Sequence, residues 1–194
     1  MIIGILGNKN VGKDTLADYL VSTEGFKKMS FAINLKECLA VMFNWDSNNF
    51  LFENKEKNDP IWNVSPRKML QLLGTEFLRN YCKDIIDCKI KFNGKEKTFS
   101  YHIKKLFLDN IELFENDDNI VISDVRFPDE LKFIKWLNGK IIKIERNNVD
   151  INQYSNHSSE NYIDKLEYDV KISNNFTKEH LYKTMNIYLE KNFN

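Results

Sequence analysis

The sequence predicts an α/β fold in which helices flank both faces of a central parallel sheet. Short apolar runs alternate with amphipathic segments along most of the 194 residues. This alternation is typical of parallel strands joined by helices. The run at 120–123 is continuously apolar up to its final serine, as expected for a strand that is buried on both faces. A glycine-rich loop separates the first apolar run from the first helix.

In the first half of the chain, apolar runs suited to strands alternate with segments of helical period. Strands are predicted at 1–6 and 26–31, and helices at 13–23, 32–43 and about 65–78. The last of these helices begins with Ser65 as the N-cap and Pro66 at the first helical position. The segment 44–63 is rich in Asn and charged residues and contains Pro60, so it is predicted to be a loop or a series of short turns.

The second half continues the alternation. The Asn93-Gly94 pair between two short runs indicates a β-hairpin. Further helices are predicted at 101–115, 128–137 and 177–191, and further strands at 120–123, 140–144 and 170–172. Thr177 is the expected N-cap of the last helix. The polar segment at about 147–161 is predicted to be a mobile loop, and the chain 1–194 to be a single domain.

Composition excludes several functional classes. The 28 basic and 28 acidic residues cancel, which argues against a surface that binds nucleic acid or membrane as a whole. No apolar run approaches the roughly 18 residues of a membrane span. The three cysteines lack the spacing of a metal site, so we expect reduced thiols in a cytoplasmic protein. We therefore expect no nucleic-acid partner and no membrane partner.

The segment from Gly7 to Thr15 reads Gly-Asn-Lys-Asn-Val-Gly-Lys-Asp-Thr. A glycine, four residues, then glycine and lysine between a strand and a helix is the spacing of the phosphate-binding P-loop. Glycine lets the backbone approach phosphate oxygens, the helix N-terminus favours anions, and Lys13 reaches the terminal phosphates. The sequence therefore predicts a P-loop NTPase fold with a bound nucleoside triphosphate. The alternative is a glycine-rich turn without a ligand.

The residue after the P-loop lysine departs from the common motif. Most P-loops place Ser or Thr there, and its hydroxyl holds Mg²⁺. This chain has Asp14 at that position and Thr15 one residue later. Because Mg²⁺ prefers oxygen ligands and keeps several waters, Asp14 is predicted to hold it directly or through water. The Lys-Asp-Thr order favours a small-molecule kinase.

A second candidate site follows the predicted strand at 120–123. Asp124 and Arg126 come at its end, and Glu130 lies one helical turn further on. Ligands of parallel α/β sheets bind beyond the carboxyl ends of the strands, so an acid and an arginine here indicate a binding site. The alternative is that Asp124 caps the following turn and Arg126 pairs with Glu130 on the surface.

Arginine is rare in this chain, with four among 28 basic residues. Arg67 lies in the first turn of the helix at 65–78, where anions are favoured. Gly74 lies inside the same helix at a cost of about 1 kcal/mol relative to Ala, which is tolerable where a ligand or another backbone approaches closely. Arg79, further along, is compatible with a solvated position.

Three motifs, taken in order, resemble those of the deoxynucleoside monophosphate kinases of phages and large DNA viruses. They are Gly-x-x-x-x-Gly-Lys-Asp-Thr, Ser-Pro-Arg-x-x-Leu-Gln-x-Leu-Gly-Thr and Ser-Asp-Val-Arg-Phe-Pro-x-Glu, and the resemblance spans roughly residues 1–175. It implies ATP- and Mg²⁺-dependent phosphorylation of a small-molecule deoxynucleoside monophosphate (dNMP). It also implies a substrate-binding helical region at about 32–115 and, for a viral chain, a place in the host cytoplasm.

The resemblance assigns residues to two sites. The ATP site would contain Asn10, Gly12, Lys13, Asp14, Thr15, Leu16 and Asn174. The acceptor site would contain Lys9, Lys36, Arg67, Gly74, Thr75, Asp124, Arg126 and Glu130. The segment His157–Glu160 is similar to the family's His-x-Ser-Glu segment. Between Arg79 and Leu106 the chain has the Asn-Gly hairpin where the family usually shows a tryptophan-containing stretch, which leaves open the contact with the base and the formation of a homodimer.

Four residues are predicted to be catalytic: Lys13, Asp124, Arg126 and Arg146. The acceptor phosphate is already anionic, so positioning and charge stabilisation suffice for the transfer. Asp124 would orient the acceptor or assist Mg²⁺, and Arg146 is either a closing arginine or a surface residue. Two alternatives remain: a kinase of another phosphorylated metabolite, similar to phosphomevalonate kinase, and a non-catalytic nucleotide-binding module.

Overall fold

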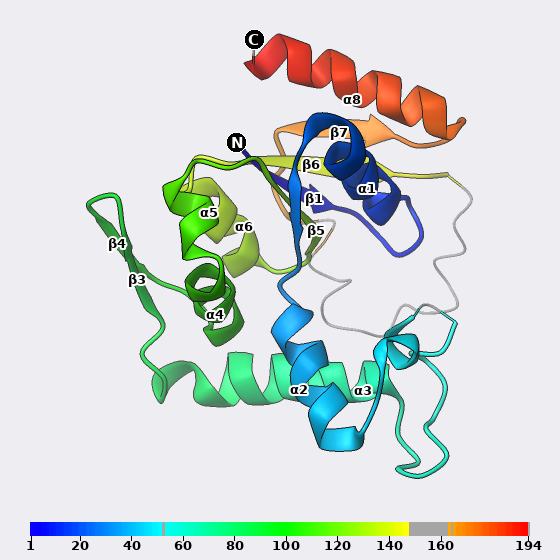
Figure 1. Ribbon diagram of the computed structural model, residues 1–194, viewed down its shortest axis with the longest axis vertical. Helices are drawn as coiled ribbons and strands as arrows, with labels where there is room; N and C mark the ends of the chain where they lie inside the picture. Colours follow the sequence, from blue (N-terminus) through cyan, green and yellow to red (C-terminus); the bar gives the residue numbers. More distant parts are fainter. Residues whose placement is uncertain (52, 148–162, 164, 194) are drawn as a thin grey trace. The chain divides into compact units, whose positions relative to one another are not determined.

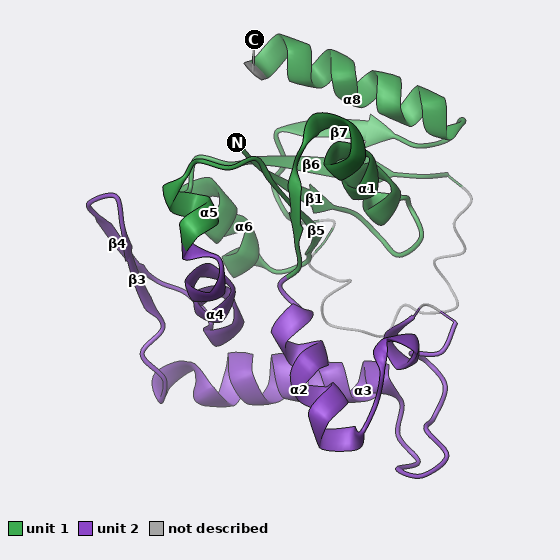
Figure 2. Ribbon diagram, viewed as in Figure 1, with its two compact units in different colours: residues 1–30, 112–194 green, residues 31–111 purple. Residues whose placement is uncertain are grey.

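The computed structural model describes residues 1–51, 53–147, 163 and 165–193. It divides into two compact units (Figure 2). Unit 1 combines Met1–Ser30 with Glu112–Asn194, and unit 2 is Phe31–Ile111. Unit 2 covers nearly the same residues as the helical region predicted at about 32–115. The predicted single domain and the role of this region in substrate binding stay predictions.

Unit 1 is built on a five-stranded sheet of order β2-β5-β1-β6-β7 (Figure 1). Its strands are β1 (Ile2–Leu6), β2 (Lys27–Met29), β5 (Ile120–Val125), β6 (Lys140–Glu145) and β7 (Val170–Ser173). Every pairing within the sheet is parallel. The predicted α/β fold is therefore confirmed. Because the strands are parallel, their carboxyl ends meet at one edge, where ligands of such sheets bind.

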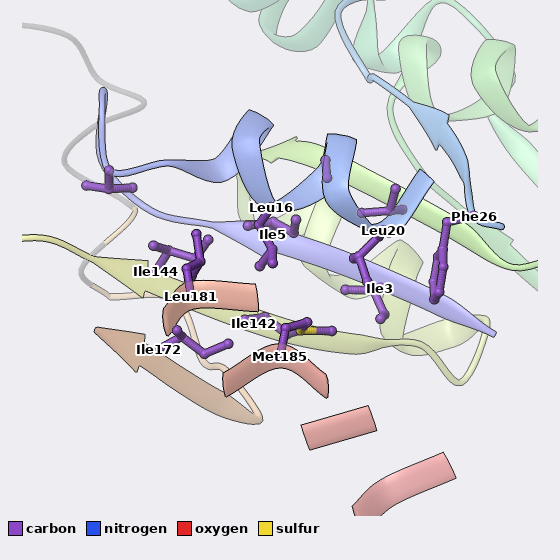
Figure 3. Packing of buried hydrophobic residues seen from close by; sticks show 13 residues of the cluster. Ile3, Ile5, Leu16, Leu20, Phe26, Ile142, Ile144, Ile172, Leu181 and Met185 are labelled. Carbon is purple, nitrogen blue, oxygen red and sulfur yellow. The ribbon is translucent and has the colours of Figure 1, made fainter. Parts of the chain in front are cut away.

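Helices cover both faces of this sheet, because side chains along each strand alternate between the faces. On one face, α1 (Lys13–Glu24) and α8 (Lys178–Phe193) pack against strand residues such as Ile3, Ile5 and Ile142 (Figure 3). On the other face lies α6 (Pro128–Trp136), and a Cβ atom at Gly4 would come within 2.5 Å of Ile134. The short helix α5 (Ile111–Glu115) places Phe114 edge-on to Phe133 of α6.

Unit 2 is mostly helical. Its elements are α2 (Ile33–Phe43), η1 (Ser47–Phe50), α3 (Pro66–Gln71), η2 (Leu72–Tyr81), η3 (Cys82–Asp84), β3 (Lys89–Phe92), β4 (Lys95–Thr98) and α4 (Tyr101–Asp109). The hydroxyl of Ser65 accepts a hydrogen bond from the backbone of Lys68, and the antiparallel hairpin turns at Asn93-Gly94, so both predictions are confirmed.

Two predicted elements differ from the structure. The helix predicted at 101–115 is split, because the Asn110 side chain donates to the carbonyl of Leu106 and ends α4. The helix predicted at 65–78 changes to a π-helix, η2. The segment predicted at 44–63 as a loop or short turns contains the short 3₁₀ helix η1 and an aromatic cluster, in which Trp45 stacks on Phe43 and donates its indole N–H to Asp59 at 2.9 Å.

Two predicted features lie outside the described residues. The mobile loop at about 147–161 does so apart from Asn147, and so does the segment His157–Glu160. Among the residues that the structure describes, no helix has both the length and the apolar character that crossing a membrane requires.

We predict that Leu181→Ala on α8 lowers the free energy of unfolding by about 2–5 kcal/mol, because the side chain is 1% exposed in the core beneath the P-loop helix. Ile187→Ala on the same helix is the control, since that side chain is 43% exposed. Urea denaturation followed by circular dichroism measures both. Equal losses for the two variants would contradict the packing described for α8.

Candidate active site

The P-loop follows β1 directly, and its backbone leaves no room for side chains at two positions. Gly7 has φ +155° and Gly12 has φ +103°, conformations that other residues rarely adopt. A Cβ atom at Gly7 would lie 2.4 Å from the carbonyl oxygen of Ile144 in β6. The loop is therefore held directly against the neighbouring strand, so the fold itself requires these glycines, and their part in phosphate binding stays a prediction.

Lys13 begins α1, and its ammonium lies over the P-loop. It donates hydrogen bonds to the carbonyl oxygens of Gly7 at 2.7 Å and Asn8 at 2.6 Å. Gly12 is the N-cap of α1, so the cap position has no side chain to cover the first amides of the helix. Free amides at a helix N-terminus and a nearby ammonium are groups that can bind an anion.

Asn174 supports the P-loop from the end of β7. Its side-chain amide donates to the carbonyl oxygen of Val11 at 2.8 Å, and its backbone N–H donates to the backbone carbonyl oxygen of Glu145 at 2.7 Å. The same amide nitrogen lies 2.5 Å from the position of a Cβ atom at Gly12. The contact predicted between Asn174 and ATP stays a prediction, and the structure adds a role in holding the loop.

Asp14, the predicted Mg²⁺ ligand, accepts two polar contacts through one oxygen. Ser123 Oγ donates to Asp14 Oδ1 at 2.9 Å, and Lys28 Nζ lies 3.0 Å from the same atom. Partial removal from water raises the pKa of Asp14, but the hydrogen bonds from Lys28 and Ser123 and the charges of Lys28 and Lys13 outweigh this effect. The pKa is therefore below its ordinary value, and Asp14 is ionised at neutral pH.

The strand-end turn after β5 is organised by Glu130. This residue is 3% exposed, and its carboxylate accepts the backbone N–H groups of Arg126 at 2.7 Å and Phe127 at 3.0 Å. The suggested surface ion pair between Arg126 and Glu130 is therefore wrong, because the Glu130 carboxylate is buried against the backbone. Asp124 accepts a hydrogen bond from the hydroxyl of Ser30 at 2.7 Å. The predicted contacts of Asp124, Arg126 and Glu130 with substrate stay predictions.

The other predicted residues of unit 1 differ in exposure. Asn10 in the P-loop and Arg146 after β6 are exposed, whereas Lys9 and Thr15 are half-buried. The Leu16 side chain is fully buried in the core between α1 and the sheet. Leu16 can therefore support the ATP site by packing and through its backbone.

The predicted acceptor residues Lys36, Arg67, Gly74 and Thr75 all belong to unit 2. Arg67 is in the first turn of α3, and its Nε lies 3.6 Å from Glu56 Oε1. A Cβ atom at Gly74 would lie 2.8 Å from the side chain of Leu35, so close packing of η2 on α2 explains this glycine. Lys36 is on α2 and Thr75 on η2, and both are half-buried. Substrate contacts of these four residues stay predictions.

Comparison with known proteins identifies the family. The family model for deoxynucleotide monophosphate kinase matches residues 46–185. The chain belongs to this family. A relative from Acanthamoeba polyphaga mimivirus, whose name describes a deoxynucleotide monophosphate kinase, is 36% identical over 186 residues, which cover 94% of this chain and 92% of the relative. The prediction of a nucleoside monophosphate kinase, with a nucleotide as its small-molecule substrate, is confirmed.

Solved structures resemble this deoxynucleotide monophosphate kinase in fold alone. Shikimate kinase from Aquifex aeolicus vf5 superimposes with a TM-score of 0.50 at 13% identity and covers 99% of this chain and 98% of its own. The protein TT1252 from Thermus thermophilus gives a TM-score of 0.50 at 16% identity, with 100% and 98% covered. At such identities the likeness supports the P-loop kinase fold and carries no substrate assignment.

Three polar residues that contact the predicted site residues Asp14 and Asp124 were not predicted from the sequence: Lys28, Ser30 and Ser123. Ser123 and Lys28 lie on the face of the sheet that α1 covers, because β2 pairs with β5 so that Lys28 is opposite Val121, two residues before Ser123. Ser30 follows the end of β2. The available signal was their position at strand ends, but strand order is needed to bring them to the P-loop.

We predict that Asn174→Ala raises the KM of this kinase for ATP by about three- to tenfold, the equivalent of one lost hydrogen bond that positions the P-loop. The variant should keep its kcat within about twofold, since Asn174 supports the loop and the Lys13 contacts remain. Asn192→Ala, which removes an exposed amide on α8, is the control. An unchanged KM for ATP in Asn174→Ala would contradict the supporting role.

Proposed function

We propose that the chain transfers the terminal phosphoryl group of ATP to a dNMP at the carboxyl edge of its parallel sheet. One observation carries this proposal: Leu6 of β1 pairs with Val125 of β5. The P-loop starts directly after Leu6, and Arg126 directly follows Val125. The phosphate-binding loop and an arginine therefore begin at adjacent strand ends, as a donor and an acceptor of phosphate require.

The transfer needs little covalent chemistry from the protein. The acceptor phosphate is anionic at neutral pH, so no strong general base is required, and catalysis consists of positioning and charge stabilisation. Lys13 would move its ammonium from the loop carbonyls to the oxygens of the β- and γ-phosphates. The amides at the N-terminus of α1 would bind the same oxygens.

The residues around Asp14 fit a magnesium ion. Its carboxylate is ionised, and the Thr15 hydroxyl and Asp124 carboxylate are further oxygen donors of unit 1. The described residues contain no cluster of three or more acidic, histidine or cysteine ligands, which suits Mg²⁺ because it takes most of its ligands from water and phosphates. Bound with ATP, Mg²⁺ would neutralise charge on the phosphate oxygens.

On the acceptor side, Arg126 would bind the dNMP phosphate with its guanidinium fork. Its backbone is fixed by the buried Glu130, and its side chain forms no salt bridge with the residues that the structure describes. Asp124 would orient the acceptor. Arg67 is proposed to bind the acceptor, and Arg146 is proposed to bind the transferred phosphoryl group. The formation of a homodimer also stays a prediction.

The two alternative functions are a kinase of another phosphorylated metabolite and a non-catalytic nucleotide-binding module. Membership of the deoxynucleotide monophosphate kinase family favours a dNMP over another phosphorylated metabolite, and the mimivirus relative is named for the same substrate class. A non-catalytic nucleotide-binding module would have no need for Arg126 at the strand end beside the P-loop.

We predict that a substrate panel shows turnover of several dNMPs with ATP and Mg²⁺, and at least about tenfold lower kcat/KM with mevalonate 5-phosphate. ADP release in a coupled assay measures both, and ribonucleoside monophosphates in the same panel measure discrimination at the 2′ position. The physical reason is that polar groups left unpaired by the wrong acceptor penalise its binding. Equal or faster turnover of mevalonate 5-phosphate would favour the metabolite kinase, and nucleotide binding without turnover of any acceptor would favour the non-catalytic module.

We predict that Arg126→Ala raises the KM for the dNMP by about tenfold or more while the KM for ATP changes by less than about twofold, because a hydrogen-bonded charge pair is lost on the acceptor side alone. Arg126→Lys should recover only part of the loss, since lysine lacks the bidentate fork. Lys132→Ala, an exposed change on α6, is the control. A raised KM for ATP with an unchanged KM for the dNMP would move Arg126 to the donor site.

A further inference from the structure

Lys28 connects two carboxylates of the P-loop helix. Its ammonium lies 3.0 Å from Asp14 Oδ1 and 2.8 Å from Asp18 Oδ1. The two acids are four residues apart on α1, so they lie one above the other on one side of the helix. One of them occupies the predicted magnesium position, and the other lies one turn further from the P-loop.

Strand pairing determines which lysine reaches these acids. Lys28 is opposite Val121, whose side chain belongs to the core beneath α1, so Lys28 points to the same face of the sheet. The preceding residue, Lys27, is opposite Ile120 and points to the other face. Two adjacent lysines with the same charge therefore have different surroundings, and only Lys28 contacts α1.

Two residues contact the same oxygen of Asp14. Lys28 and Ser123 both reach Oδ1. A P-loop with Ser or Thr at this position carries a neutral ligand and needs no counter-ion. A carboxylate beside the P-loop is charged before a cation arrives, and repulsion between this carboxylate and the phosphates of an incoming nucleotide has to be offset.

We propose that Lys28 is the counter-ion of the magnesium ligand Asp14, and that its ammonium passes to Asp18 when a divalent cation binds with the nucleotide. Lys28 is then a positioning residue: it neutralises Asp14 before binding and releases it afterwards, and Asp18 makes the release easier by accepting the ammonium. This inference rests on the proposed role of Asp14 in holding Mg²⁺.

If Lys28 and the divalent cation compete for Asp14, substitutions of Lys28 and of Asp18 should have opposite effects on cation binding. Lys28→Met removes the competitor, so half-maximal turnover should require a lower Mg²⁺ concentration. Asp18→Asn removes the alternative partner of Lys28, so half-maximal turnover should require a higher Mg²⁺ concentration. Exposed ion pairs are worth a fraction of a kcal/mol to about 1 kcal/mol, which corresponds to shifts of about two- to fivefold in each direction. Lys28→Arg keeps the charge and should stay near wild type.

The double variant Lys28→Met/Asp18→Asn separates this mechanism from a general change of charge. If Asp18 acts only through Lys28, the double variant has the same cation affinity as Lys28→Met. If both residues act only through the long-range field, their effects add and the double variant returns close to wild type. Lys27→Met is the matched control, with the same charge change on the same strand and no contact with α1.

Mn²⁺ binding provides a readout that does not depend on activity. Free Mn²⁺ is titrated by electron paramagnetic resonance into protein saturated with ADP, for the wild type, the variants and the Lys27→Met control. The Mg²⁺ concentration at half-maximal turnover is measured in parallel. We expect tighter Mn²⁺ binding in Lys28→Met, weaker binding in Asp18→Asn, and equal values for Lys28→Met and the double variant.

Different results would overturn different statements. Additive effects in the double variant, or no shift in Lys28→Met, would overturn the role of Lys28 while the proposed function stands. Asp14→Asn tests the proposed metal ligand separately: unchanged Mn²⁺ affinity in this variant would show that Asp14 does not hold the cation, and both the assignment of Asp14 and the inference built on it would fall. Turnover of dNMPs by the wild type is independent of either result.

Discussion

The close packing of the P-loop against β6 and β7 is the constraint on which the donor site depends. A Cβ atom at Gly7 would collide with the carbonyl oxygen of Ile144, and the side-chain amide of Asn174 lies where a Cβ atom of Gly12 would be. Because the loop is packed in this way, its backbone amides have a fixed orientation before a nucleotide binds. The loss of loop entropy on binding is therefore smaller. The shape of the loop therefore depends on contacts with β6 and β7, strands that are distant from it in sequence.

The electrostatic arrangement follows from that rigid loop. Lys13 is held by carbonyl oxygens of the loop, which can be exchanged for phosphate oxygens without leaving a charge unpaired. Asp14 brings a negative charge next to the same place, and the contacts from Lys28 and Ser123 compensate it. The substitution of an acid for the usual hydroxyl residue is therefore accompanied by a lysine that reaches it from the edge strand.

The sequence predicts the local features and the parallel sheet, but not the side-chain contacts that depend on the order of the strands. The P-loop, the Ser65 cap and the Asn-Gly hairpin are encoded within a few residues, and the structure contains all three. Lys28 and Ser123 meet Asp14 only because β2 and β5 are neighbours, and no spacing in the chain encodes that. The role of Glu130 was hidden as well, because Phe127 occupies the N-cap where a capping box usually shows Ser or Thr.

The match of the family model and the P-loop lie in different parts of the chain. The family model matches residues 46–185, which begin well after the P-loop and include the turn with Asp124 and Arg126. A P-loop alone is shared by many nucleotide-binding proteins, and the likeness to shikimate kinase reaches no further than the fold. The residues matched by the family model, 46–185, thus indicate a deoxynucleotide monophosphate as the phosphate acceptor. The P-loop, which lies outside that match, indicates a nucleoside triphosphate as the donor. The pairing of Leu6 with Val125 joins the two lines of evidence, because it brings the donor loop and the matched strand end to the same edge of one sheet.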